Sequence, residues 1–130
     1  MVLPEDKFDV DAVKRLDKEL PENVIPLLPE LMEWLQDMNW PVAKAVLPLL
    51  IRYEDITTQI AMDILKQDQK DDIWKYQIIK DFVPAVSDSN QNILFDSISR
   101  IAYHPTKGEK TEEVDEAARE YLLQLKRSQR

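Results

Sequence analysis

The chain has 130 residues, a formal net charge of −8 at pH 7, 44% hydrophobic residues, one glycine and no cysteine. A single domain of this length can bury a sizeable core, and the lack of cysteine excludes disulfides and thiolate chemistry. Sheets, hairpins and phosphate-binding loops need glycine for positive φ angles, so the composition predicts an all-α domain over residues 1–130.

The charge and the apolar pattern also restrict location and partners. An acidic chain repels phosphate backbones, so we expect no nucleic-acid partner. The acidic start, MVLPEDKFDVD, lacks the apolar core of a signal peptide. No apolar run is long enough for a bilayer crossing, so we expect no membrane partner and a cytoplasmic location.

The predicted elements begin with a capping helix at about 8–20, for which Asp9 is the N-cap and Pro21 the stop. The first helix pair follows at about 27–51, with apolar residues at helical spacing in both halves. Pro41 belongs in the first turn of the second helix, where a missing N–H costs nothing. Pro48 should kink this helix or split off its last turn.

Two further helix pairs are predicted at about 55–83 and 91–126. In the second pair, Asp71 or Asp72 caps the second helix. Residues 87–90, SDSN, are interpreted as a loop and cap cluster, and residues 105–110, PTKGEK, as the most mobile loop. Thr111 is predicted to cap the last helix.

The first two pairs share an internal signal. Asp37-Met-Asn-Trp40 recurs as Asp71-Asp-Ile-Trp74, 34 residues later. A period near 34 residues with two helices per unit is typical of an α-solenoid, so we expect a short α-α superhelix of about three helix pairs plus the capping helix.

The stretch LLPELMEWLQDMNWPVAKAVLPLL resembles a HEAT-like repeat, in which an apolar helix leads through an Asp-x-x-Trp-like turn into an amphipathic helix. Together with DDIWKYQIIKDF, it resembles a small bacterial family of HEAT-like domains of unknown function. This resemblance implies the fold and a bacterial, cytosolic setting, and it implies no catalytic residue.

The residues themselves indicate no chemistry. His104 is the single histidine and precedes a proline at a helix end, where it acts as a dipole partner. Asp68, Asp71 and Asp72 lack the glycine and the closing glutamate of a calcium loop. Nearly every Asp and Glu falls opposite an apolar stripe, so the polar faces are interpreted as solvated. We therefore predict no enzyme activity, no cofactor and no metal.

The second helices carry the candidate partner-binding residues. Trp40 and Trp74 begin these helices. They are expected either to pack as wedges between repeats or, if partly exposed, to anchor an interaction surface, since tryptophan is enriched at binding hot spots. Lys75 and Lys80 lie on the same helices, and this aromatic and basic face would suit an acidic segment. The predicted partner-binding set is Trp40, Lys44, Arg52, Tyr53, Trp74 and Tyr76.

We therefore predict a non-enzymatic protein–protein interaction module that binds a partner on the ridge of its second helices. One form of it is an immunity-like or antitoxin-like inhibitor, in which an acidic body blocks a basic active site and its charge steers association. The alternative is a HEAT-like nucleic-acid-processing enzyme resembling the glycosylases, which the acidic charge disfavours.

Overall fold

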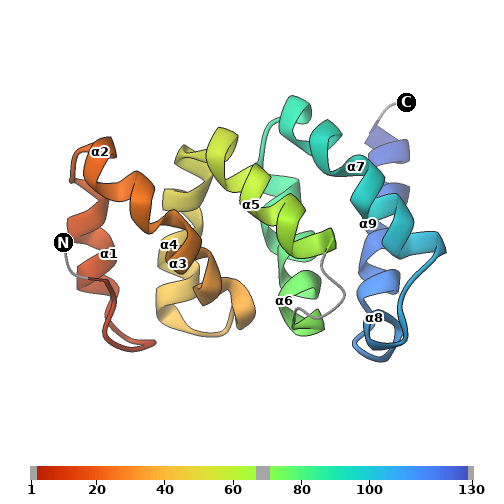
Figure 1. The fold of residues 1–130 in the computed structure, drawn as a ribbon, viewed down its shortest axis with the longest axis horizontal. Coiled ribbons are helices and arrows are strands. Elements are labelled where there is room, and N and C mark those ends of the chain that lie inside the picture. Colours follow the sequence, from red (N-terminus) through yellow and green to blue (C-terminus); the bar gives the residue numbers. More distant parts are fainter. Residues whose placement is uncertain (1–2, 67–70, 129–130) are drawn as a thin grey trace.

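The computed structural model describes residues 3–66 and 71–128, and every element in these ranges is helical. Figure 1 shows an elongated molecule in which the helices follow one another from α1 at one end to α9 at the other. In this view α3, α5 and α7 lie in front of α4, α6 and α9. Along the front row, α5 packs against both α3 and α7. The all-α prediction is therefore confirmed.

The N-terminal helix is shorter than its predicted range of 8–20. Helix α1 covers Val10–Asp17 and packs against α4. Asp9 is its N-cap, as expected, and its carboxylate accepts a hydrogen bond from the Ala12 N–H at 3.3 Å. The backbone N–H of Val42 donates to the carbonyl of Lys7 at 3.0 Å, which ties this end of the chain to α4.

Three prolines divide the next segment into short helical pieces. It runs through α2 (Pro21–Val24), the 3₁₀ turn η1 (Ile25–Leu27), α3 (Leu28–Met32) and the 3₁₀ turn η2 (Glu33–Gln36). Each proline stands at the start of a piece, where its missing N–H breaks no intrahelical bond. The chain therefore keeps one general direction while its helical geometry changes.

Helices α4 (Pro41–Arg52) and α5 (Glu54–Lys66) form a tight pair. Pro41 begins α4, as predicted. Pro48 does not split off the last turn, because α4 continues through it to Arg52. Because Pro48 has no N–H, the carbonyl of Lys44 lacks its helical hydrogen-bond donor. Both residues are exposed, so water can bond to that carbonyl instead. At the α4–α5 junction the Thr57 hydroxyl donates to the Leu50 carbonyl at 2.9 Å.

The next helix changes its winding before a proline. Helix α6 (Asp72–Gln77) leads into the π-helical turn η3 (Ile78–Phe82) and the 3₁₀ turn η4 (Val83–Ala85). Pro84 cannot donate to the carbonyl of Lys80, so the α-helical bonding pattern ends ahead of it. Asp71 is the N-cap of α6, and its side chain accepts from the Ile73 N–H at 2.9 Å.

The C-terminal region differs most from the predictions. Residues 88–90, predicted as loop, form the first turn of α7 (Asp88–Tyr103), and only Ser87 stands as a cap. The predicted mobile loop at 105–110 is largely helical, because α8 covers Lys107–Thr111. Thr111 ends α8 and does not cap the last helix, α9 (Val114–Ser128). Between α8 and α9, Glu113 adopts a left-handed φ of 60°.

The apolar residues form one continuous core along the molecule. Each helix from α1 to α9, except the short α8, contributes apolar residues to it, and the contribution of α6 is the aromatic ring of Trp74. The fully buried members include Leu16, Leu28, Leu35, Leu50, Leu65, Ile78, Phe82, Leu94, Ile101 and Val114. Burial of this set is the main stabilising contribution to the fold.

Candidate functional site

The predicted partner-binding residues on α4 are partly available to solvent. Trp40 is half-buried and lies edge-to-face against Trp34, with ring centroids 5.8 Å apart. Lys44 is exposed. Arg52 is exposed but pairs with Asp17, with 2.7 Å between the guanidinium Nη1 and the carboxylate Oδ1. Tyr53 is half-buried, and the Arg52 guanidinium lies 5.6 Å from its ring centroid.

The two predicted partner-binding residues on α6 differ in burial. Trp74 is only 7% exposed, and its indole Nε1 donates to the Met32 carbonyl at 3.0 Å. It is therefore a wedge between helices rather than a surface anchor. Tyr76 is half-buried, and the Lys80 ammonium lies 5.6 Å from its ring centroid. The six predicted residues thus spread along two helices and do not form one cluster.

The basic residue between these two aromatic residues is buried. The Lys75 side chain is 0% exposed, and its Nζ lies 3.0 Å from Oε2 of Glu109, which is also 0% exposed. The expectation that Lys75 belongs to a solvent-facing surface is therefore wrong. The prediction that the acidic faces are solvated does not hold for two residues, because Glu109 and Asp115 are buried. Glu109 comes from the segment that was predicted as a mobile loop. A charge can stay in the interior because it has a close partner of opposite sign.

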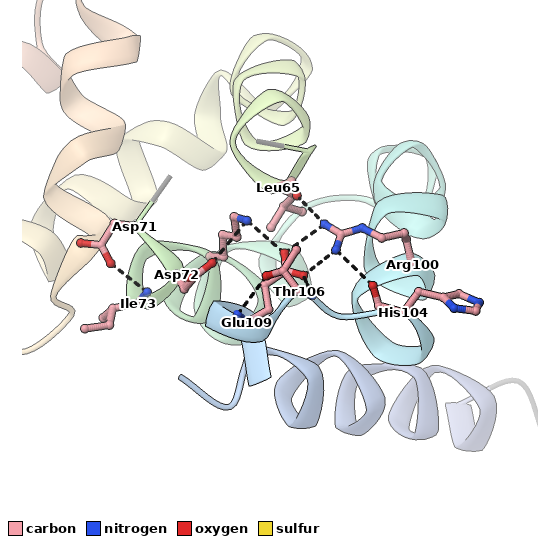
Figure 2. A network of polar contacts seen from close by, with 9 residues as sticks. Leu65, Asp71, Asp72, Ile73, Arg100, His104, Thr106 and Glu109 are labelled. Atoms are coloured by element: carbon pink, nitrogen blue, oxygen red, sulfur yellow. Dashed lines mark hydrogen bonds and ion pairs between the residues drawn. The ribbon is translucent and has the colours of Figure 1, made fainter. Parts of the chain in front are cut away.

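The partly exposed Arg100 completes a cluster around this pair, which we call the Glu109 cluster (Lys75, Arg100 and Glu109, with Asp72 beside them). Arg100 Nη2 donates to Glu109 Oε2 at 3.0 Å and to the Leu65 carbonyl at 3.1 Å. Figure 2 shows the Arg100 guanidinium between Leu65, His104 and Glu109. The cluster links α6, α7 and α8 through one carboxylate.

The Glu109 carboxylate is held in its charged form. Burial raises its pKa, but hydrogen bonds from Arg100, from the Thr106 backbone and from Lys75 outweigh this effect and lower the pKa to about 2. The Thr106 N–H donates to Glu109 at 2.9 Å while the Thr106 hydroxyl accepts from the Glu109 N–H, which is a capping box. Every lone-pair direction of this carboxylate serves the fold, so we assign it a structural role.

The single glycine fits against this cluster. A Cβ atom placed on Gly108 would clash with Oδ2 of Asp72. The other carboxylate oxygen, Oδ1 of Asp72, lies 3.4 Å from Lys75 Nζ. The lack of a side chain at Gly108 therefore allows α8 to approach α6 closely enough for Glu109 to reach Lys75.

An open groove lies between α6–η3 and α9, and we call it the α6–α9 groove. Its volume is about 270 Å³. Tyr76, Ile79 and Tyr121 supply aromatic and aliphatic lining, and Glu116 and Glu120 are exposed residues of α9 on its acidic side. The full lining is Tyr76, Ile79, Lys80, Pro84, Glu113, Glu116, Ala117, Glu120, Tyr121 and Gln124.

Tyr121 has a fixed orientation in this groove. Its hydroxyl donates to Oε1 of Gln91 at 2.5 Å. Burial and the nearby Asp88 raise the pKa of the Tyr121 phenol, so the hydroxyl stays protonated at neutral pH and remains a donor. The groove therefore offers a rigid aromatic surface with an acidic side.

Within residues 3–66 and 71–128, no group of three or more His, Asp or Glu side chains is placed to hold a metal ion. His104 is exposed at the end of α7, as predicted from its position before a proline. Asp68 lies outside the described residues. Asp71 caps α6 and Asp72 joins the Glu109 cluster, so both have structural roles.

Sequence reasoning missed the acidic residues of α9 and the role of Glu109. The signal for Glu109 was present, because Thr106-x-x-Glu109 is the pattern of a capping box. The α6–α9 groove had no such signal, since it depends on which helices become neighbours. Tyr121 lies at the edge of the core with 8% exposure, and it also lines the groove.

Comparison with known proteins places the chain in one family. None of the described helices has both the length and the apolar character that a bilayer crossing requires. A family model described as a domain of unknown function (DUF5071) matches residues 2–122. No curated protein matches the chain.

Proposed function

We propose that this chain, which belongs to the DUF5071 family, is a non-enzymatic protein-binding module. It is a short stack of three HEAT-like helix pairs, and it binds its partner on the outer face of the second helices α4, α6 and α9. The proposal also includes a bacterial, cytoplasmic setting. One specific form of the proposal is an immunity-like protein that inhibits a basic partner protein.

The α6–α9 groove is the observation that supports binding on this face. Its aromatic and aliphatic lining includes Tyr76 and Tyr121, residue types that are enriched at binding hot spots. At about 270 Å³ it is open and smaller than most small-molecule pockets, and it matches one or two side chains of a partner protein.

The charges around the groove favour a basic partner. Lys75 is buried in the Glu109 cluster and Arg52 is paired with Asp17, so neither adds free positive charge to the second helices. The described lining of the groove has three exposed carboxylates, Glu113, Glu116 and Glu120, against the exposed ammonium of Lys80. This arrangement argues against the acidic segment that the sequence pattern suggested, and it agrees with the net charge of −8.

Partner capture with a groove variant tests the proposal. Ala117→Arg places a long cationic side chain in the groove, and we expect it to abolish a complex that the unmodified chain forms when co-expressed with proteins from its own organism. Ser99→Arg, on a partly exposed position of α7 outside the groove, is the control and should leave the complex intact. Equal capture by both variants would rule out the groove as the partner site.

A further inference from the structure

All three tryptophans of the chain line two neighbouring grooves at the N-terminal half of the molecule. The first groove, of about 330 Å³, contains Trp34 and Trp40 together with Leu3, Pro4 and Gln36. The second, of about 280 Å³, lies between α3 and α5 and contains Trp74. Glu30 and Glu33 line both grooves, so they form a shared acidic ridge between them.

The charge in these grooves is of one sign. Glu30, Glu33 and Asp63 are exposed, and within residues 3–66 and 71–128 none of them forms an ion pair. The described lining of both grooves contains no lysine or arginine. The lining of the α6–α9 groove contains Lys80 as a positive charge beside its glutamates, whereas the described lining around the acidic ridge contains no positive charge.

The aromatic geometry suits a flat cation. Trp34 and Trp40 meet at an interplanar angle of 76°, and both are partly exposed. In such an edge-to-face pair, the ring that contributes its edge keeps both of its faces uncovered by the other ring. A guanidinium group can stack on an indole face while its N–H groups bond to a carboxylate, and an ammonium group does this less well.

We propose that the two grooves bind two arginine side chains of one partner segment, one stacked on the partly exposed Trp34–Trp40 pair and one paired with the carboxylates of the second groove, where Trp74 is buried, with Glu30 and Glu33 between them as the shared counter-charge. This inference goes beyond the α6–α9 groove and uses none of its residues. Charge complementarity selects the occupant, because a lining with two tryptophans in contact, three exposed carboxylates and no described base disfavours an acidic or a purely apolar segment.

Intrinsic fluorescence provides a direct test, because every tryptophan of the chain lies in these grooves. The probe is a capped Gly-Arg-Gly-Arg-Gly peptide, with Gly-Lys-Gly-Lys-Gly for comparison. We expect a saturable change in tryptophan emission with the arginine peptide, and binding weaker by about tenfold in Glu30→Gln/Glu33→Gln. The matched control, Glu116→Gln/Glu120→Gln, removes the same charge at the α6–α9 groove and should bind the peptide as the unmodified chain does.

Three outcomes would overturn the inference. The first is that the arginine peptide causes no saturable change in emission. The second is an equal loss of affinity in both double variants, which would indicate only the general field of the acidic chain. The third is that the lysine peptide binds as tightly as the arginine peptide. Circular dichroism of each variant establishes that it is folded, which is expected because the substituted side chains are exposed. Partner capture at the α6–α9 groove is a separate measurement, so either proposal can fail without the other.

Discussion

Lys75 and Glu109 stand 34 residues apart in the chain and form an ion pair in which both side chains are fully buried. Removal of Lys75 takes one of the two cationic partners from Glu109 and leaves Arg100 as the other, so the carboxylate is not left unpaired. We therefore expect Lys75→Met to lower the free energy of unfolding by about 1–3 kcal/mol in urea denaturation, the cost of losing one buried hydrogen bond to a charged group. Arg52→Met breaks an exposed pair and should cost less than about 1 kcal/mol. Similar losses in the two variants would contradict the assignment of the buried pair.

Substitution of the glycine should be unfavourable in spite of helix propensity. Alanine is favoured over glycine inside a helix by about 1 kcal/mol, but the added Cβ of Gly108→Ala would displace the Asp72 carboxylate. Because the displaced group is the end of the Asp72 side chain, we expect a net loss of about 1 kcal/mol, at the low end of the cost of overpacking. In an Asp72→Ala background, the same substitution should become neutral or stabilising. A double-mutant cycle measures this coupling, and additive effects would show that the contact is not limiting.

The depressed pKa of Glu109 predicts a specific acid sensitivity. Its pKa is about 2 in the folded chain and 4.5 when unperturbed, so the unfolded state binds the proton more readily. The stabilisation is complete above about pH 4.5 and is lost as the pH falls from there toward 2, with a magnitude of roughly 3 kcal/mol. The difference in unfolding free energy between the unmodified chain and Glu109→Gln should therefore shrink across this range. Glu116→Gln, at an exposed position, serves as the control and should show no comparable change.

Relief of the left-handed backbone at Glu113 should stabilise the chain. Its φ of 60° costs free energy for a residue with a Cβ atom, whereas glycine adopts this conformation freely. We expect Glu113→Gly to raise the unfolding free energy by up to about 1 kcal/mol. Glu113→Ala removes the same charge but keeps the Cβ, and it should give no such gain. A rise in melting temperature for both variants would point instead to charge repulsion.

The sequence predicts what depends on local chemistry. Pro41 at a helix start and Asp9 as an N-cap follow from missing donors and available acceptors, and both are confirmed. Asp37 and Asp71, the echoed aspartates, each accept a hydrogen bond from the N–H two residues later, at 2.9 Å. Their helices nevertheless begin at different distances from them, at Pro41 and at Asp72.

The missed features depend on contacts between distant segments. The charge of Lys75 indicates a surface position unless Glu109 is known to approach it, and Gly108 lies directly against Asp72 where α8 meets α6. The same holds for Trp74, whose burial depends on the Met32 carbonyl of another helix. Single-sequence periodicity contains no information about these pairings, so it assigned Lys75 to the binding face and PTKGEK to a loop.

The position of Glu109 also affects how the folded chain opens. Its carboxylate holds α6 through Lys75 and α7 through Arg100, while its own backbone belongs to α8. None of these helices can separate from the others without exposing an unpaired charge. In native-state hydrogen exchange, the slowest amides of α6 and α7 should therefore open together as one cooperative unit. The amides of α1, which packs mainly on α4 at the other end, can exchange through a smaller and independent opening.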